Sequence, residues 1–125
     1  MAIFQRFGYF SIYTMAIFYI TAGLMHFYNP LWFVSIVPPI IPYKLELVYL
    51  TGIAEIVLGF LLVFPKSRFF ACIGLIFLLI LVYPANIYLA LTNGKAIGVS
   101  PIVAWGRLPL QFLFIGIAYW HTKIK

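Results

Sequence analysis

Four long apolar runs, separated by short segments with proline, glycine or charged residues, follow one another along the chain. A helix of about 20 residues, rising roughly 1.5 Å per residue, is long enough to cross the hydrocarbon of a bilayer. The runs cover about residues 7–27, 47–64, 69–91 and 103–120, and each predicts one transmembrane helix. Short connections force neighbouring helices to run antiparallel. The pattern therefore predicts an all-α, antiparallel bundle of four transmembrane helices, with residues 1–125 forming a single integral membrane domain.

The segment after the first run is apolar but cannot be a spanning helix. Asn29-Pro30 ends the first helix, and three further prolines follow before Tyr43. Proline has no backbone N–H and disfavours a helical conformation at the residue before it, so it breaks a helix when it stands in the interior. Trp32, Tyr43 and Lys44 are residue types typical of the membrane surface. We therefore expect an interfacial or re-entrant loop across the mouth of the bundle.

The remaining connections are shorter or more polar. Pro65–Arg68 is expected to form a tight basic turn, and Thr92–Pro101, with two glycines and Lys95, a polar loop. Pro84 is expected to interrupt the third span, with a kink that frees a backbone carbonyl there. The first run is too long and too aromatic for the apolar region of a signal peptide, so we expect a retained helix.

Composition excludes most other classes of protein. Of the 125 residues, 66% are hydrophobic and only 8% are charged, too few charges to cover a water-soluble globule of this size. The net charge of +6 comes from scattered basic residues that form no stripe or helix face, so no nucleic-acid partner is expected. A single cysteine, Cys72, allows no disulfide within the chain. The lipid bilayer is the expected partner of the apolar helices.

The basic residues indicate topology instead, because the cytoplasmic side of a membrane protein carries the excess of Lys and Arg. The side predicted to hold both termini and the second connection carries five basic residues, against three on the other side. We expect a multi-pass protein of the bacterial cytoplasmic membrane with both termini in the cytoplasm. The five are Arg6, Lys66, Arg68, Lys123 and Lys125, and the three are Lys44, Lys95 and Arg107.

Glu55 is the most informative polar residue, because it falls inside a predicted spanning helix. It lies nine residues after Glu46, which stands at the start of that helix, and hence about 13 Å deeper. An ionisable group at this depth costs a few kcal/mol to insert, so it should face the bundle interior and have a partner. Gly52 and Gly59 flank it at helical spacing, which favours a close neighbouring helix on that face, whereas Leu58 is expected to face lipid.

The other three predicted helices also carry polar residues on one face. Tyr19 and Gly23 precede His26 on one face of the first helix, and Arg107 and Gln111 share a face of the fourth. The antiparallel order brings these faces together in the half of the bundle away from the termini. The sequence therefore predicts one polar pocket there, formed by His26, Glu55, Tyr83, Asn86, Arg107 and Gln111.

The role of this pocket stays open between three readings. Glu55 and Arg107 are the expected charge pair, directly or through His26 or a water molecule, and such a pair can simply fix helix register in lipid. Alternatively, the pocket binds a ligand, or it moves a proton or an ion. Ligation of haem by two histidines of one chain is not expected, since His26 and His121 fall at opposite membrane faces. The sequence also has no motif for a metal site, a Ser/His/Asp arrangement or a phosphate loop. Whether the chain is an enzyme stays undecided, and no motif requires a cofactor.

Several motifs along the chain resemble, in order and spacing, those of the DoxX-like family of small four-span membrane proteins. They are Thr21–Phe27 with Asn29-Pro30, Val37–Pro39, Leu47–Ile56, Tyr83–Tyr88 and Arg107–Gln111, and together they extend over about residues 21–120. The resemblance implies a four-helix membrane bundle. It maps the family's buried acid onto Glu55, and its Asn and Arg positions onto Asn86 and Arg107. Similar proteins accompany membrane complexes, some of them redox complexes, or assist their assembly.

Pocket and resemblance together favour an accessory or assembly subunit of a membrane complex. Its partner is expected to be another membrane protein or a second copy of the chain. The alternative is a redox accessory that binds a quinone or another small ligand, with His26 and Arg107 as hydrogen-bond donors and Glu55 as proton acceptor. A minimal channel or carrier is the least favoured function, because four short helices leave little lumen.

Overall fold

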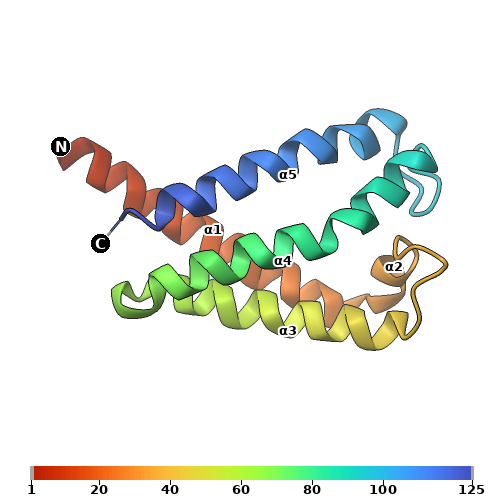
Figure 1. Ribbon diagram of the computed structural model, residues 1–125, viewed down its shortest axis with the longest axis horizontal. Helices are drawn as coiled ribbons and strands as arrows, with labels where there is room; N and C mark the ends of the chain where they lie inside the picture. The colour runs from red at the N-terminus through yellow and green to blue at the C-terminus, as the bar shows by residue number, and fades with distance from the viewer. Residues whose placement is uncertain (1, 125) are drawn as a thin grey trace.

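The computed structural model describes residues 2–124 of the chain, with side chains from residue 6 onward. Its helices are α1 (Ala2–Tyr28), α2 (Pro30–Val34), α3 (Lys44–Val63), α4 (Pro65–Leu91) and α5 (Pro101–His121). All except α2 are long and apolar enough to cross a membrane, which confirms the predicted all-α fold with four candidate membrane spans. Both termini lie at one end of the molecule, and α2 and the two longer connections lie at the other (Figure 1). We call these the termini end and the loop end.

The spanning helices pack in chain order. α1 packs against α3, α3 against α4 and α4 against α5, while α2 lies on α1 and α3. Side chains join α1 to α5 near the termini, where Ser11 Oγ is 2.8 Å from His121 Nε2, and at mid-span, where the ring centroids of Phe18 and Phe114 are 5.3 Å apart. From there the two helices diverge toward the loop end (Figure 1). The bundle is thus tied together at the termini end and spreads at the loop end.

The apolar core fills the half of the bundle nearest the termini. Ile12, Leu62 and Leu75, from α1, α3 and α4, are almost completely buried there, and apolar residues of α5 pack against them. A smaller cluster at the loop end includes Ile36, from the connection after α2, and Leu89 of α4. Burial of large aliphatic side chains at both ends leaves the region between the two clusters for the polar residues.

The turn predicted at Pro65–Arg68 is wrong. Its proline is the first residue of α4, where a backbone N–H would make no hydrogen bond within the helix, so proline is tolerated there. The chain reverses direction through Phe64. Arg68 is only 2% exposed and turns back onto α3. Its Nε and Nη2 donate to the carbonyl oxygens of Leu62 and Val63, each at 3.0 Å. These carbonyls lie at the negative end of the α3 dipole, where a helix offers them no backbone partner.

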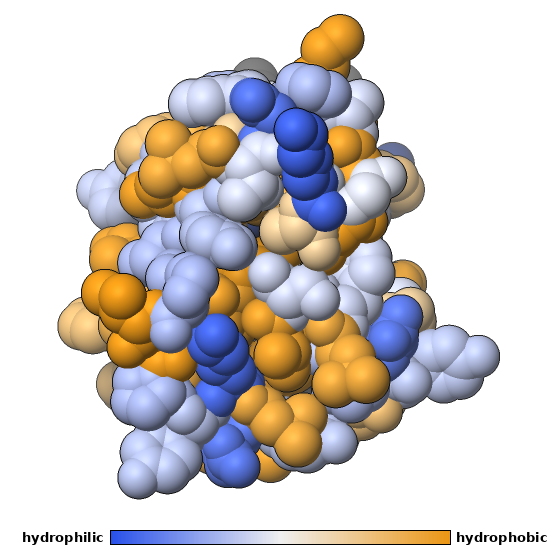
Figure 2. Space-filling model, turned by 90° about the vertical axis from the view of Figure 1, so that its right-hand side faces the viewer, coloured by the Kyte–Doolittle hydropathy of each residue, from blue (hydrophilic) through white to orange (hydrophobic). Residues whose placement is uncertain are grey.

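The proline-rich connection does not form a spanning helix, as expected. Pro30 begins the five-residue α2, and an irregular segment then leads to Tyr43 at the start of α3. Figure 2 faces the loop end, where hydrophilic and apolar side chains are intermixed. Glu46 and Lys95 are exposed in the part of the chain near this end, as is Ile40. Such mixing is typical of the boundary between membrane and water.

Two details of the spans differ from expectation. α4 continues through Pro84 as one helix, so this proline does not interrupt the span. Leu58 does not face lipid: it is half-buried, packs against the main apolar cluster and lies against Gly74 of α4. The absence of a side chain at Gly74 makes room for Leu58. Leu58, which was expected to face lipid, therefore belongs to the contact between α3 and α4.

Candidate functional site

A cavity of about 680 Å³ lies between the two apolar clusters, with walls from all four spanning helices and from the connection after α2. Five of the six predicted pocket residues line it, namely His26, Glu55, Asn86, Arg107 and Gln111. Tyr83 does not line the cavity, because its ring packs against Phe112 of α5 with centroids 5.5 Å apart. Tyr83 is three residues before Asn86 and therefore about 60° away around the helix, which turns it toward the outer side of the α4–α5 contact.

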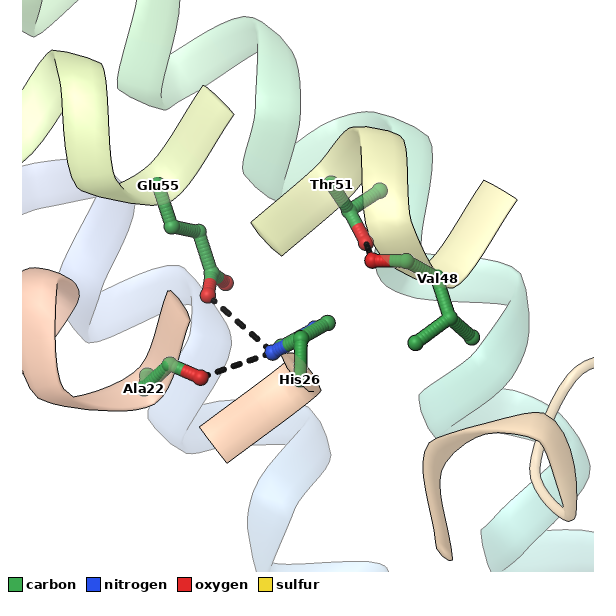
Figure 3. A network of polar contacts seen from close by, with 5 residues as sticks. All are labelled: Ala22, His26, Val48, Thr51 and Glu55. Carbon is green, nitrogen blue, oxygen red and sulfur yellow. Dashed lines mark hydrogen bonds and ion pairs between the residues drawn. The ribbon is translucent and has the colours of Figure 1, made fainter. Parts of the chain in front are cut away.

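His26 and Glu55 form the first polar wall, where α1 meets α3 (Figure 3). Glu55 Oε2 is 3.5 Å from His26 Nδ1, and the same nitrogen lies 2.7 Å from the carbonyl oxygen of Ala22. Since a carbonyl oxygen can only accept, we assign the proton of the neutral ring to Nδ1. The ring also stacks on Phe33, with centroids 3.8 Å apart. His26 is therefore held by its own helix and by α2, with Glu55 facing it from α3.

Glycines bring α1 and α3 close enough to form this wall. A Cβ added to Gly52 would lie 2.8 Å from Cβ of His26, and one added to Gly23 would lie 2.6 Å from the carbonyl oxygen of Gly52. Real Cβ contacts are not this short, so no larger residue fits unless the helices move apart. The close helix neighbour predicted on the Glu55 face is confirmed.

The second polar wall is a chain of hydrogen bonds where α4 meets α5. Gln111 donates from Nε2 to the carbonyl oxygen of Leu79, and it accepts from Nδ2 of Asn86. Asn86 Oδ1 in turn accepts from Nε of Arg107 at 3.1 Å. Asn86 and Gln111 are buried, so few alternative partners compete for them. The chain holds the Arg107 side chain against the cavity wall.

A direct Glu55–Arg107 ion pair is not formed. Within the described residues, Glu55 lies 3.5 Å from His26, one of the intermediates that the sequence suggested, and Arg107 donates to Asn86. α4 packs between α3 and α5, so these two helices are not neighbours in the bundle. Glu55 and Arg107 therefore line one cavity from different walls, and a direct pair would require α3 and α5 to adjoin.

Three polar groups on the cavity wall have unused bonding capacity. The hydroxyl of Tyr19 and Oε2 of Glu55 are buried and have no hydrogen-bond partner in the described part of the chain. The terminal nitrogens of Arg107 make no hydrogen bond with residues 6–124, where only its Nε is engaged. A buried polar atom without a partner costs about 1–3 kcal/mol.

Sequence reasoning missed much of the cavity wall, and Phe33 and Thr51 are two instructive examples. Thr51 Oγ1 donates to the carbonyl oxygen of Val48 at 2.9 Å, within its own helix. Its place four residues before Glu55 is a usable signal, because such residues share a helix face. Phe33 gives no comparable signal. It lies in α2, and only the packing of that short helix on α1 brings its ring onto His26.

The site can form hydrogen bonds and attract an anion. Among the residues that the structure describes, no group of three or more His, Cys, Asp or Glu side chains could hold a metal ion. His26 lies in the cavity wall, whereas His121 is buried at the termini end beside Ser11. The two histidines therefore cannot share one ligand within a chain. The chemistry of the wall rests on the carboxylate of Glu55, the guanidinium of Arg107 and the neutral groups around them.

A family model described as Domain of unknown function (DUF8561) matches residues 15–122 of the chain. The matched region begins within α1 and ends one residue beyond α5, so it includes the whole cavity wall. No curated protein and no solved structure is significantly similar to the chain.

Proposed function

This chain belongs to the DUF8561 family, and we propose that it is a multi-pass membrane protein whose cavity binds an amphipathic small molecule. One observation carries the proposal. A cavity of about 680 Å³ has mostly apolar walls, and a few polar side chains, among them Glu55 and Arg107, line it. Sites for small molecules are typically lined by apolar side chains with a few polar groups that orient the ligand. A ligand with an apolar body and a polar head fits both parts of the wall.

A purely structural role accounts for only one of the two polar walls. The chain from Leu79 through Gln111 and Asn86 to Arg107 fixes α4 against α5, as polar contacts between membrane helices do. The other wall holds the carboxyl group of Glu55, whose 3.5 Å contact with His26 is not a hydrogen bond. An ionisable group inside a membrane span is costly and normally has a partner, which favours a ligand in that role.

The packing supports a binding site that is blocked at the termini end, rather than a channel. Ile12, Leu62 and Leu75 are at most 1% exposed and fill the bundle at the termini end. The cavity lies at the loop-end side of this apolar cluster. A continuous water-filled path across the bundle would have to pass through this apolar cluster. Water is poorly accommodated among close-packed aliphatic side chains.

Two finer features of the proposal rest on sequence. The motif order that resembles the DoxX-like family supports a role as an accessory subunit of a membrane complex, for which a quinone is one candidate ligand. The basic residues near both termini support a cytoplasmic location for the termini and an outward position for the cavity.

Native mass spectrometry of the protein, extracted in a mild uncharged detergent, tests the proposal. We expect a bound species of small-molecule mass on the wild-type protein. Val82→Phe should remove it, because Val82 lines the cavity and phenylalanine would occupy part of that space. Ile80→Phe is the matched control, since Ile80 lies on the same helix, is 57% exposed and does not line the cavity. No bound species on the wild type, or equal loss in both variants, would contradict the proposal.

A further inference from the structure

The guanidinium of Arg107 is positioned as a receptor for an anion. Its Nε is committed to Asn86 Oδ1 at 3.1 Å, and Asn86 is itself fixed by Gln111. This contact holds the side chain at the cavity wall, so Arg107 cannot extend freely to the membrane surface as long cationic side chains near helix ends do. The two terminal nitrogens remain free of hydrogen bonds to the described residues. They form the planar fork that binds carboxylate and phosphate oxygens well.

Within the described residues, no acidic side chain forms an ion pair with this guanidinium. The sequence contains two acidic residues, Glu46 and Glu55. Glu46 is exposed at the start of α3, and Glu55 lies on the other polar wall, where its Oε2 is 3.5 Å from Nδ1 of His26. A cation held within a spanning helix without an opposite charge is costly, and in membrane proteins such residues are normally paired. A ligand with a negative charge would therefore supply the partner that Arg107 lacks.

The cavity reaches the outside of the bundle where α1 and α5 diverge. Phe18 of α1 and Leu110 of α5 line the cavity and are also 45% and 43% exposed. The contact between Phe18 and Phe114 lies at the inner end of this opening. Toward the loop end α1 and α5 separate (Figure 1). An alkyl chain can pass between them from the cavity to the surrounding lipid, in contact with apolar side chains over its whole length.

We propose that the ligand is an anionic amphiphile, a carboxylate or phosphate group on a single alkyl chain. Its head binds the terminal nitrogens of Arg107, and its tail leaves the bundle between α1 and α5. This inference rests on the proposed function and adds the charge and shape of the ligand.

The test compares dodecanoate, dodecyl phosphate and uncharged dodecanol as probes of the purified full-length protein in an uncharged detergent. Titration calorimetry gives the three dissociation constants, and circular dichroism checks the fold of each variant. We expect the better of the two anions to bind at least about tenfold more tightly than dodecanol, as a charge-assisted hydrogen bond implies. The tighter of the two identifies the head as carboxylate or phosphate. Dodecanol binding as tightly as both anions would overturn the proposal.

Variants locate the binding site of the anion. Arg107→Gln should reduce the preference for the anions over dodecanol to less than about threefold, and Glu55→Gln should keep or increase it. Lys95→Gln, which removes an exposed cation near the loop end, should leave the preference unchanged. A preference that survives Arg107→Gln, or that Lys95→Gln removes, would overturn the proposal. If Arg107→Gln does not fold, Arg107→Lys serves instead, since it keeps the charge without the fork and should retain only part of the preference.

The two proposals fail in different ways. If none of the three probes binds, or if the bound species found by mass spectrometry is uncharged, the anionic class is wrong. The proposed function still stands in that case, provided that Val82→Phe removes the bound species and Ile80→Phe does not. If neither variant affects it, both proposals fail together.

Discussion

Arg68 and Arg107 are both arginines of candidate membrane spans, but their guanidinium groups meet different surroundings. Arg68 is buried at the termini end and donates to two carbonyl groups at the end of α3. Arg107 donates through one nitrogen to Asn86 and otherwise faces the cavity. The first contact uses the charge to satisfy the backbone, and the second leaves most of the charge available. At the scale of single residues, the loss of Arg68 should therefore affect stability, and the loss of Arg107 should affect binding.

Replacing Arg68 with glutamine should lower the free energy of unfolding by about 2 kcal/mol, because two charge-assisted hydrogen bonds to helix carbonyls are lost. Lys66→Gln is the control, since Lys66 is exposed two residues earlier, and it should change stability by less than about 0.5 kcal/mol. Reversible unfolding in mixed detergent micelles measures both. An equal effect of the two substitutions would mean that the carbonyl contacts of Arg68 contribute little.

Double-mutant cycles separate the polar contacts that touch from those that do not. Asn86→Leu and Gln111→Leu should be non-additive by about 1 kcal/mol, because the two side chains share a buried hydrogen bond. Glu55→Gln and Arg107→Gln should be additive within about 0.5 kcal/mol, because those residues form no ion pair. A strong coupling between Glu55 and Arg107 would restore the direct charge pair that the sequence suggested.

At the scale of helices, the contact between α1 and α3 depends on backbone proximity. Gly23 and Gly52 face each other there, and an added Cβ on either meets backbone or Cβ atoms at less than 3 Å. Gly106 of α5, by contrast, has no atom within 4 Å of where its Cβ would be. Glycine thus allows a close contact between helices at Gly52 of α3, whereas at Gly106 of α5 it lies on an open surface.

Gly52→Ala should destabilise the protein by about 1–3 kcal/mol, since α1 must move or His26 must shift to admit the methyl group. Gly106→Ala should be neutral or stabilise by up to about 1 kcal/mol, because alanine favours helix and meets no neighbour. Thermal unfolding of the two variants side by side is the measurement. Equal stability of the variants would exclude a tight contact at Gly52.

Much of the helical pattern could be predicted from the sequence, because long apolar runs and proline positions constrain the spans strongly. The error at Pro65–Arg68 arose because a proline followed by polar residues is as typical of the first turn of a helix as of a loop. Leu58 was placed toward lipid because the pattern of its own helix does not show that Gly74 of the neighbouring helix leaves room for its side chain. The first error is local and concerns where a helix begins. The second concerns a contact between helices, which depends on residues that are distant in sequence.

At the scale of the whole molecule, the order of packing decides which polar residues meet. The sequence indicated that polar faces converge, and five of the six predicted residues line one cavity. It did not indicate that α4 separates α3 from α5, so of the contacts it suggested for Glu55, the one with His26 is present and the direct one with Arg107 is not. Tyr83 fell outside the wall for a related reason, since the direction of its ring depends on where α5 packs against α4.

Topology is also a property of the whole chain. Reporter fusions at the C-terminus and in the Thr92–Gly98 segment should report opposite compartments, with the C-terminus in the cytoplasm. The bias of basic residues persists when Arg68 and Arg107, which contact other parts of the protein, are set aside. An extracytoplasmic C-terminus would place the cavity in the inner half of the membrane instead.

The burial of Cys72 has a practical consequence for all of these measurements. It is the only cysteine of the chain, is 0% exposed and belongs to the main apolar cluster. A thiol reagent can reach it only when the bundle opens, so the rate of alkylation reports how often opening occurs. If reclosing is faster than alkylation, each 1.4 kcal/mol of lost stability should speed labelling about tenfold. Alkylation of the native Cys72, followed by the mass of the intact chain, thus measures the opening of the bundle without an engineered probe.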